Sequence, residues 1–380
     1  MRLKSVNLRP NTRRILALSK DHGSVQSIAP VVAELKDKNY SVSLFLSQGR
    51  HSVAAMFGLN CEMFDEQAFS AAPEKYIAKV FDEVNAALLL TGSSLAIGER
   101  PETPEQYAIK EAGRRNIPSI VVLDYWGMYE ERFCSNDGSI DPTLIPNMLC
   151  VLDNRCKEDL LLLGVPPERI VITHNPWLDS VVGDAKKQPP PSKLLNNQGW
   201  RVLFISQPLK KFTEADDPSL QHELVESLVN ALPQAWQQRH QVLVWKHPSE
   251  PMERWRSANR FNSPNVEVCV TDERGSTLLA HVDLVVSVHS TVAFEALHLG
   301  TPCLSLRMGL PVPHLYADEL GLSKIISTHE YLQTFLRAAS PFKLRKKLRE
   351  LSQHCYDEGL FFSDGKATDR VVALVLQLIK

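Results

Sequence analysis

The segment Val282–Arg307 combines residue types that can bind an oxyanion and a sugar diol. Its pattern predicts a buried strand, Asp283–Val288, then a polar turn, a helix and a second buried strand, Cys303–Leu306. Backbone N–H groups at a helix start can bind a phosphate, and an acid one turn later can accept hydrogen bonds from a ribose diol. A capped helix with an acid in its first turn is the ordinary alternative. The candidate binding residues here are Ser287, His289, Ser290, Thr291 and Glu295.

Two further polar groups in the second half of the chain also follow apolar segments. Ser206 and Gln207 are placed to bind a phosphate or to position a sugar, and a helix-initiating turn is the equal alternative. Lys246 and His247 supply two cationic donors, and Pro248 fixes the turn behind them. Because a cation pair at a strand end is poorly placed for packing, we expect this pair to bind a phosphate.

The first half of the chain offers candidate bases. Asp21 and His22 follow the first apolar segment, and either can accept a proton from a hydroxyl. Gly23 opens the next helix and can approach a phosphate or a sugar through its backbone. An ordinary turn with Ser24 as the helix cap explains the same residues equally well. Thr91–Ser94, at the end of a later strand, leaves a binding role and a capped turn equally open.

The segment Asp124–Phe133 contains aromatic residues, three acids and an arginine directly after a buried strand. Aromatic faces can stack on the C–H groups of a sugar, and Asp124, Glu130 or Glu131 can deprotonate a hydroxyl. The alternative is a surface loop that packs Trp126 and leaves its charges in water. The position at a strand end favours the functional interpretation.

Apolar strands alternate with amphipathic helices through both halves of the chain. Uninterrupted apolar strands between helices indicate parallel sheets that are covered on both faces. The expected strands are Arg14–Ser19, Ser41–Leu46, Ala86–Leu90, Ser119–Leu123, Met148–Leu152, Ile170–Thr173, Trp200–Ser206, Gln241–Lys246, Val266–Val270, Asp283–Val288 and Cys303–Leu306. The expected helices include Pro73–Val84, Thr103–Arg115, Leu220–Leu232, Pro341–Cys355 and Thr368–Ile379.

The polar, Pro-rich stretch Lys186–Ser192 separates the two alternating halves. A chain of 380 residues is long for one core and natural for two. We therefore expect an α/β protein with two doubly wound, Rossmann-like domains that face a cleft. The expected boundaries are 1–185 for the first domain, 186–365 for the second, and 366–380 for a helix that can cross back to the first.

Composition excludes several classes of protein. The hydrophobic content of 44% and charged content of 23% are ordinary for a globular protein, and a net charge of -2 gives no case for a nucleic-acid partner. No apolar run is long enough to cross a membrane, and the basic start lacks the apolar core of a secretory signal. The seven cysteines show no zinc-site spacing, so we expect buried, reduced thiols in the cytosol and no metal site.

The order of these features resembles the GT-B superfamily. In particular, the chain looks like bacterial UDP-N-acetylglucosamine 2-epimerases, lipid-linked N-acetylglucosaminyltransferases, and the capsule and teichoic-acid polymerases. The matching segments lie at similar places along nearly the whole chain. They are Gly23–Lys36, Leu160–Asp179, Lys246–Pro248, Ser287–Arg307 and Asp364–Val371.

The resemblance implies that the second domain binds a nucleotide sugar. By it, Ser290 and Thr291 bind the diphosphate, Glu295 binds the ribose, and His247 holds the phosphate of the donor. The epimerases carry a Gly-Gly pair where this chain has Ser290 and Thr291. The capsule polymerases carry a glycine after an acidic pair, where this chain has Arg132. The epimerases also carry acids after the third and fourth strands in a distinct pattern, where this chain offers only Asp124, Glu130 and Glu131. Because of these departures, transfer of the sugar is the better interpretation.

The sequence thus predicts a metal-independent glycosyltransferase without a cofactor, which uses a UDP-sugar as donor. The acceptor would be a carbohydrate, a lipid-linked compound or a small molecule, bound by the first domain. The alternatives are a 2-epimerase or hydrolase acting on the nucleotide sugar, and a non-catalytic nucleotide-sugar-binding protein. We expect a cytoplasmic protein. For the basic segment Lys343–Arg349, contact with the inner face of a membrane is the alternative to a solvated helix face.

Overall fold

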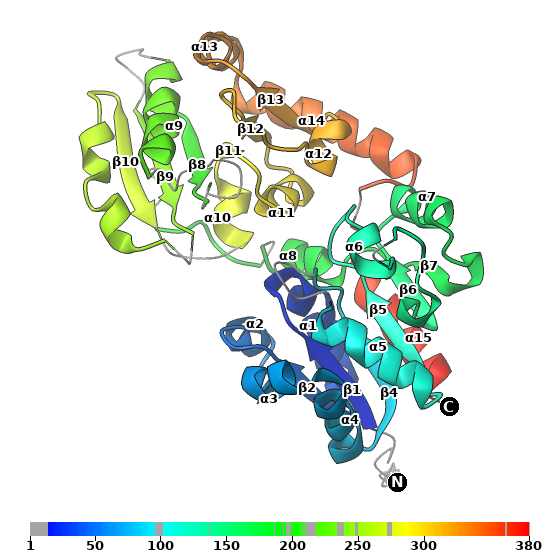
Figure 1. Cartoon of the computed structure of the whole chain (residues 1–380). Helices are drawn as coiled ribbons and strands as arrows, with labels where there is room; N and C mark the ends of the chain where they lie inside the picture. Colours follow the sequence, from blue (N-terminus) through cyan, green and yellow to red (C-terminus); the bar gives the residue numbers. More distant parts are fainter. Residues whose placement is uncertain are drawn as a thin grey trace, which may run out of the picture. The chain divides into compact units, whose positions relative to one another are not determined.

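The structure is a computed structural model of the chain, which divides into two compact units. One unit is Met1–Ser180 with Ser363–Lys380, and the other is Val181–Phe362 (Figure 1). The structure describes residues 14–95, 102–135, 137–185, 187–192, 194, 199–207, 209, 218–233, 239–247, 250–271, 276–361 and 363–379.

The first unit is built on a parallel seven-stranded sheet with the order β3-β2-β1-β4-β5-β6-β7. Its strands are β1 (Arg14–Ser19), β2 (Ser41–Leu46), β3 (Glu62–Met63), β4 (Ala86–Thr91), β5 (Ser119–Val122), β6 (Met148–Val151) and β7 (Ile170–Ile172). Its helices are α1 (His22–Asp37), α2 (His51–Met56), α3 (Glu66–Ala71), α4 (Pro73–Val84), α5 (Pro104–Arg114), α6 (Glu130–Phe133), α7 (Asn154–Leu163) and α15 (Ala367–Leu378). The chain passes between the units within α8 (Pro176–Ala185).

The second unit is built on a parallel six-stranded sheet with the order β10-β9-β8-β11-β12-β13. Its strands are β8 (Arg201–Ile205), β9 (His240–Trp245), β10 (Val266–Thr271), β11 (Leu284–Ser287), β12 (Cys303–Leu306) and β13 (Ser323–Ile326). Its helices are α9 (Pro218–Ala231), α10 (Ser276–His281), α11 (Val292–His298), α12 (Tyr316–Glu319), α13 (His329–Ala338) and α14 (Pro341–Asp357).

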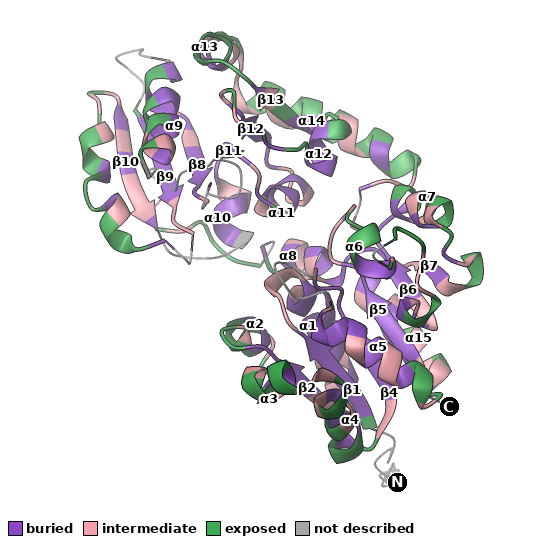
Figure 2. Ribbon diagram, viewed as in Figure 1, coloured by how far each residue is buried: buried purple, intermediate pink, exposed green. Residues whose placement is uncertain are grey.

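The central strands of both sheets are buried along most of their length (Figure 2). In the first unit, β1 and α1 pack in one core with Val371, Val372 and Val375 of α15. Each such side chain contributes roughly 1.5–3 kcal/mol through burial of apolar surface. Helix α15 is also capped from outside, because Asp179 Oδ2 accepts a hydrogen bond of 2.8 Å from Ala367 N. These contacts place the end of the described chain in the first unit.

The expected α/β fold with two doubly wound sheets is confirmed. All eleven expected strands are present, with ends that differ by at most one residue. The sequence did not predict β13 or α13, which complete the second unit. All seven cysteines are free thiols; Cys61, Cys134 and Cys269 are half-buried, while the other four are buried.

Each sheet has one place where its strand order reverses direction. In the first sheet this switch point lies between β1 and β4, and in the second it lies between β8 and β11. Loops that leave the carboxyl ends of strands beside such a point are the usual ligand sites of open α/β sheets. The polar candidates of the sequence follow these strands and their neighbours, so the fold gathers them at two places.

Candidate functional site

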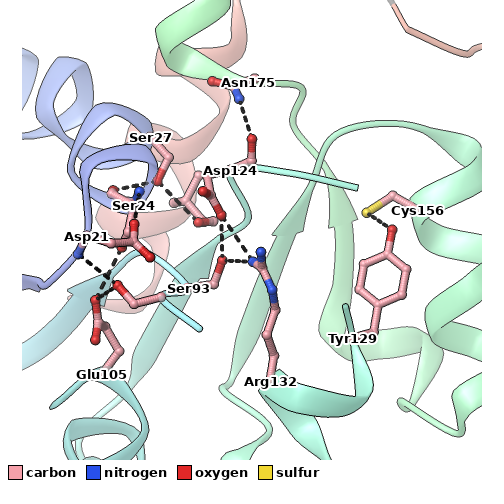
Figure 3. Close-up of polar contacts among 12 residues, drawn as sticks. Asp21, Ser24, Ser27, Ser93, Glu105, Asp124, Tyr129, Arg132, Cys156 and Asn175 are labelled. Carbon is pink, nitrogen blue, oxygen red and sulfur yellow. Dashed lines mark hydrogen bonds and ion pairs between the residues drawn. The ribbon is translucent and has the colours of Figure 1, made fainter. Parts of the chain in front are cut away.

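In the first unit, the ends of β1, β4 and β5 carry a connected set of polar side chains (Figure 3). Strands β1 and β4 pair directly, as do β4 and β5, so the loops after them are neighbours. We call this set the carboxylate cluster. It consists of Asp21, Ser24, Ser93, Ser94, Glu105, Asp124 and Arg132.

Asp124 is the member of the cluster that combines a strong ion pair with partial exposure. Its Oδ1 lies 3.1 Å from Arg132 Nη1 and accepts a hydrogen bond of 3.1 Å from Ser93 Oγ. The Arg132 side chain is 3% exposed and the Asp124 side chain 16% exposed, so the aspartate, unlike the arginine, is partly accessible to solvent. Burial raises the pKa of Asp124, the Arg132 charge opposes this effect, and the Asp21 charge adds to it.

Helix α1 begins directly beside Asp124. Asp21 caps the helix, since its Oδ1 accepts a hydrogen bond of 2.8 Å from Ser24 N. Gly23 lies in the first turn, and a Cβ atom there would overlap Asp124 Oδ2. The glycine therefore allows the carboxylate to approach the helix start. His22 is the first residue of α1 and is half-buried.

Glu105 is a buried carboxyl that sequence reasoning missed. It lies in the first turn of α5, and its side chain is turned toward the ends of β1 and β4 (Figure 3). Its Oε1 accepts hydrogen bonds from Lys20 N at 2.7 Å, from Ser24 Oγ at 3.3 Å and from Ser94 Oγ. Burial raises the pKa of Glu105 to about 7, the Asp21 charge adds to the rise, and the bonds from Ser94 and Lys20 oppose it.

The residues after Asp124 divide between the cluster and the surface. Glu130 and Glu131 of α6 are exposed, whereas Arg132 on the same helix is buried against Asp124. In the described part of the chain, neither glutamate contributes its carboxylate to the contacts of the cluster. The expected acidic group therefore reduces to Asp124, because the short helix turns its two glutamates outward.

The aromatic residues of this segment pack within the protein. The indole of Trp126 is 7% exposed and donates to Asp153 Oδ2 at 2.8 Å. The Tyr129 hydroxyl lies 3.1 Å from Cys156 Sγ (Figure 3). The expectation that the aromatic residues stack on a sugar is wrong for these two, because packing against α7 buries both rings. Their burial fixes the segment that positions Arg132.

In the second unit, the ends of three neighbouring strands, β9, β8 and β11, carry the remaining candidates. Gln207, which follows β8, forms hydrogen bonds with both the backbone N–H and the carbonyl of His289, in the turn after β11. Its Oε1 accepts from His289 N at 2.8 Å, and its Nε2 donates to His289 O. Gln207 thus holds the turn that carries Ser290 and Thr291.

Ser206 and the residues after β9 share one buried acid, Glu250. Glu250 Oε2 accepts from Ser206 Oγ at 2.6 Å and from His247 N at 3.1 Å. The Lys246 ammonium donates to two backbone carbonyls, those of His247 at 2.9 Å and Glu250 at 2.7 Å. Lys246 therefore uses two of its donors to fix the turn, and His247 is half-buried at its start. Pro248 lies outside the described residues.

The candidate residues of the turn after β11 and of the helix that follows differ in their exposure. Ser287 and Ser290 are buried, Thr291 is exposed, and His289 and Glu295 are half-buried. Ser290 Oγ accepts a hydrogen bond of 3.3 Å from Val292 N, whereas Thr291, the N-cap residue of the next helix, forms no capping bond through its side chain. The helix that follows, α11, has seven residues and carries Glu295 in its first turn.

The described ranges of the chain contain neither a metal-binding cluster nor a membrane-spanning helix. There, no group of three or more His, Cys, Asp and Glu side chains is arranged to hold a metal ion. Within the same ranges, no helix has the length and apolar character needed to span a membrane. In the basic segment Lys343–Arg349, Arg345 donates to the carbonyls of Val282 and Gly300, while the other cations are exposed on α14.

Solved structures with similar folds cover nearly the whole chain. A putative UDP-N-acetylglucosamine 2-epimerase from Listeria monocytogenes matches 95% of this chain and 95% of its own, with a TM-score of 0.70 and 16% identity. The UDP-GlcNAc 2-epimerase from Neisseria meningitidis, bound to UDP-GlcNAc, matches 96% of this chain and 100% of its own, with a TM-score of 0.68 and 14% identity. CalG4, the calicheamicin glycosyltransferase, matches 96% of this chain and 99% of its own, with a TM-score of 0.62 and 13% identity.

These similarities define the architecture as GT-B, with two Rossmann-like domains in one chain. The fold expected from the resemblance is therefore confirmed. No protein-family model matches the chain, and no curated protein matches its sequence. At identities of 13–17% among the similar structures, the likeness concerns the fold.

Proposed function

We propose that the protein is a glycosyltransferase that moves a sugar from a UDP-sugar to a hydroxyl of an acceptor. The observation that carries the proposal is Asp124, a partly exposed aspartate that follows β5, next to the switch point between β1 and β4. Its raised pKa makes it a better proton acceptor than an ordinary aspartate while Arg132 holds it in one orientation. The acceptor is a carbohydrate, a lipid-linked compound or a small molecule, bound by the first unit.

In the proposed reaction, Asp124 takes the proton of the acceptor hydroxyl while the hydroxyl oxygen attacks the anomeric carbon of the donor. The bond from that carbon to the diphosphate breaks, and UDP leaves with the electron pair. His247 and Ser290 would stabilise the charge on the diphosphate, and Glu295 would bind the ribose. His247 follows β9 and Ser290 follows β11, the two strands that flank β8, and this placement supports the assignment. The proposal includes no resident metal, and an assay with EDTA tests that part.

Epimerisation of a UDP-sugar is a second candidate. It is favoured by the TM-scores of the two epimerases, 0.70 and 0.68, which exceed the 0.62 of CalG4. Against it, the partly exposed carboxylates Asp21 and Asp124 gather at one edge of one sheet. A change of configuration at a ring carbon needs proton exchange on two faces, whereas activation of a hydroxyl needs one base.

The two candidates differ in their products. Incubation with UDP-GlcNAc, followed by measurement of UDP release with and without a panel of acceptors, separates them. A transferase releases UDP in proportion to glycosylated acceptor. UDP-N-acetylmannosamine, or free N-acetylmannosamine together with UDP, formed without any acceptor would instead establish the epimerase. Before the assay, a thermal-shift panel of UDP, CMP, CDP, GDP and TDP identifies the nucleotide, since a ligand of the native state raises the melting temperature.

A further inference from the structure

Glu105 cannot meet a substrate directly, yet it contacts both loops that surround the site. Its side chain is 1% exposed, in contrast to Asp124. One carboxylate oxygen, Oε1, receives donors from three stretches of chain: Lys20 N after β1, Ser24 Oγ in α1 and Ser94 Oγ after β4. The second oxygen, Oε2, is buried and has no hydrogen-bond partner among the described residues. Burial of a carboxyl group with one unpartnered oxygen costs free energy, which indicates that the group has a role in the structure.

The two serines after β4 connect Glu105 to the reactive part of the cluster. Ser94 donates to Glu105 Oε1 and accepts a hydrogen bond of 3.0 Å from Asp21 N. The adjacent Ser93 donates to Asp124 Oδ1 and accepts from Arg132. Consecutive residues of one loop therefore hold the two carboxyl groups, and Figure 3 shows both sets of contacts side by side.

We infer that Glu105 is a positioning residue, whose negative charge holds the ends of β1 and β4 in the arrangement that places Asp21 and Asp124. When Glu105 is ionised, Oε1 is a charged acceptor for Lys20 N and for Ser94, and charged acceptors form stronger hydrogen bonds than neutral ones. Protonation removes that charge and loosens both loops together. The link to catalysis rests on the proposed function, whereas the link to the loops does not.

The surroundings of Glu105 set the pH at which this change occurs. Among the described residues, the charge that acts on Glu105 is that of Asp21, at the start of α1. Asp124, which follows β5, and Arg132 of α6 belong to the adjoining part of the cluster, which Ser93 and Ser94 connect to Glu105. Arg50 Nε donates to Lys20 O at 3.3 Å, so this cation neighbours the same loop. Burial and the Asp21 charge raise the pKa of Glu105 to about 7, so the strength of its hydrogen bonds to the two loops changes across neutral pH.

The test compares the parent protein with E105Q, which keeps the shape of the side chain and removes its charge. E111Q is the matched control, because Glu111 lies on the same helix and pairs with Arg114 at the other end. Amide hydrogen exchange around Lys20 and Asp21 is measured by mass spectrometry at pH 6 and pH 8, corrected for the intrinsic rate. This readout needs no substrate.

In the parent protein and in E111Q, protection of these two amides should rise from pH 6 to pH 8. In E105Q it should be flat and roughly tenfold lower at pH 8, as expected for the loss of a hydrogen bond to a charged acceptor. Equal protection in E105Q and the parent at both pH values would overturn the inference. If E105Q does not fold, S94A serves instead, because it removes the acceptor of Asp21 N. Unchanged exchange at Asp21 in S94A would overturn it equally.

A second arm addresses catalysis. With a nucleotide sugar that the parent protein turns over, E105Q should lower kcat roughly tenfold and change KM less than twofold, because the residue positions groups without binding the donor. An unchanged kcat in folded E105Q would reject the positioning role. Absence of turnover in the parent protein would refute the proposed function, and the exchange experiment would then decide the inference alone.

Discussion

The Gly23 backbone and the Asp124 carboxylate occupy neighbouring space that leaves no room for a Cβ atom between them. Gly23 lies in the first turn of α1, and Asp124 follows β5, on the far side of β4 in the sheet. The φ angle of Gly23 is not in the left-handed region, so the backbone conformation alone does not require a glycine. A glycine is required because Asp124 approaches the backbone so closely. The position of the proposed base thus depends on the absence of one methyl group at the start of α1.

Gly23→Ala should displace the Asp124 carboxylate and reduce turnover at least tenfold. The overlap should also destabilise the protein by about 1–3 kcal/mol, as overpacking usually does. Gly113→Ala is the control, because a Cβ atom there meets open space on α5. Chemical denaturation and UDP-release assays measure the two effects. Wild-type turnover in Gly23→Ala would contradict the placement of Asp124 as the base.

Asp124→Asn should lower kcat by roughly 10²–10⁴-fold, the usual contribution of a general base. UDP affinity should stay within twofold, because the donor groups belong to the other unit. Asp159→Asn, which alters a surface aspartate paired with Arg155, serves as the control. Steady-state kinetics and calorimetry with UDP provide the comparison. A loss of UDP affinity as large as the loss of kcat would place Asp124 in donor binding instead.

Glu105 should make the stability of the protein depend on pH. Because folding raises its pKa from the ordinary 4.5 to about 7, the folded state binds this proton more tightly. The resulting contribution to global stability is fully present below pH 4.5 and is lost as the pH rises through 7, because unfolding frees the carboxylate from burial. The effect on the two loops has the opposite sign, because local opening with Glu105 still buried breaks only the hydrogen bonds that favour its charged form. This increase in the pKa of Glu105 corresponds to roughly 3 kcal/mol of folding free energy.

Denaturation of the parent protein and of E105Q between pH 4.5 and pH 8 measures this loss. The parent protein should lose stability relative to E105Q as the pH increases. The Asp124 pKa is also raised, but Asp124 is present in both proteins and its effect largely cancels in the difference. A difference that stays constant with pH would show that Glu105 does not titrate in this range.

Gln207→Ala should free the turn after β11, since both of its hydrogen bonds to His289 are lost. Two hydrogen bonds contribute roughly 1–3 kcal/mol, so UDP affinity should fall about tenfold or more if this turn binds the diphosphate. Gln353→Ala, which alters an exposed glutamine of α14, is the control. Unchanged affinity by calorimetry would remove the turn from the donor site.

Several features could be predicted because they depend on local patterns. Uninterrupted apolar segments such as Ser119–Leu123 and Cys303–Leu306 identify buried strands without tertiary information. The strand β13 begins with Ser323 and Lys324 at the edge of its sheet, so its pattern lacks that signal. Asp124 was predicted as a candidate because it follows a buried strand directly.

Other features depend on contacts that the sequence does not display. Thr103 and Gln106 form a capping box, which predicts the start of α5 correctly. The same pattern treats Glu105 as an ordinary acid in a first helical turn. Its role appears only when the fold brings Lys20 and Ser94 to its carboxylate, from 85 and 11 residues away. In the same way, the outward direction of Glu130 follows from how α6 packs and not from its composition.

Helix α15 has a consequence for biosynthesis. Its valines complete the core around β1 and α1, and Asp179 caps its start. During synthesis from the N-terminus, the first unit therefore emerges early from the ribosome but lacks one covering helix. The second unit is available in full before residues 367–378 are translated. The part of the chain that is made first is thus the part whose core is completed last.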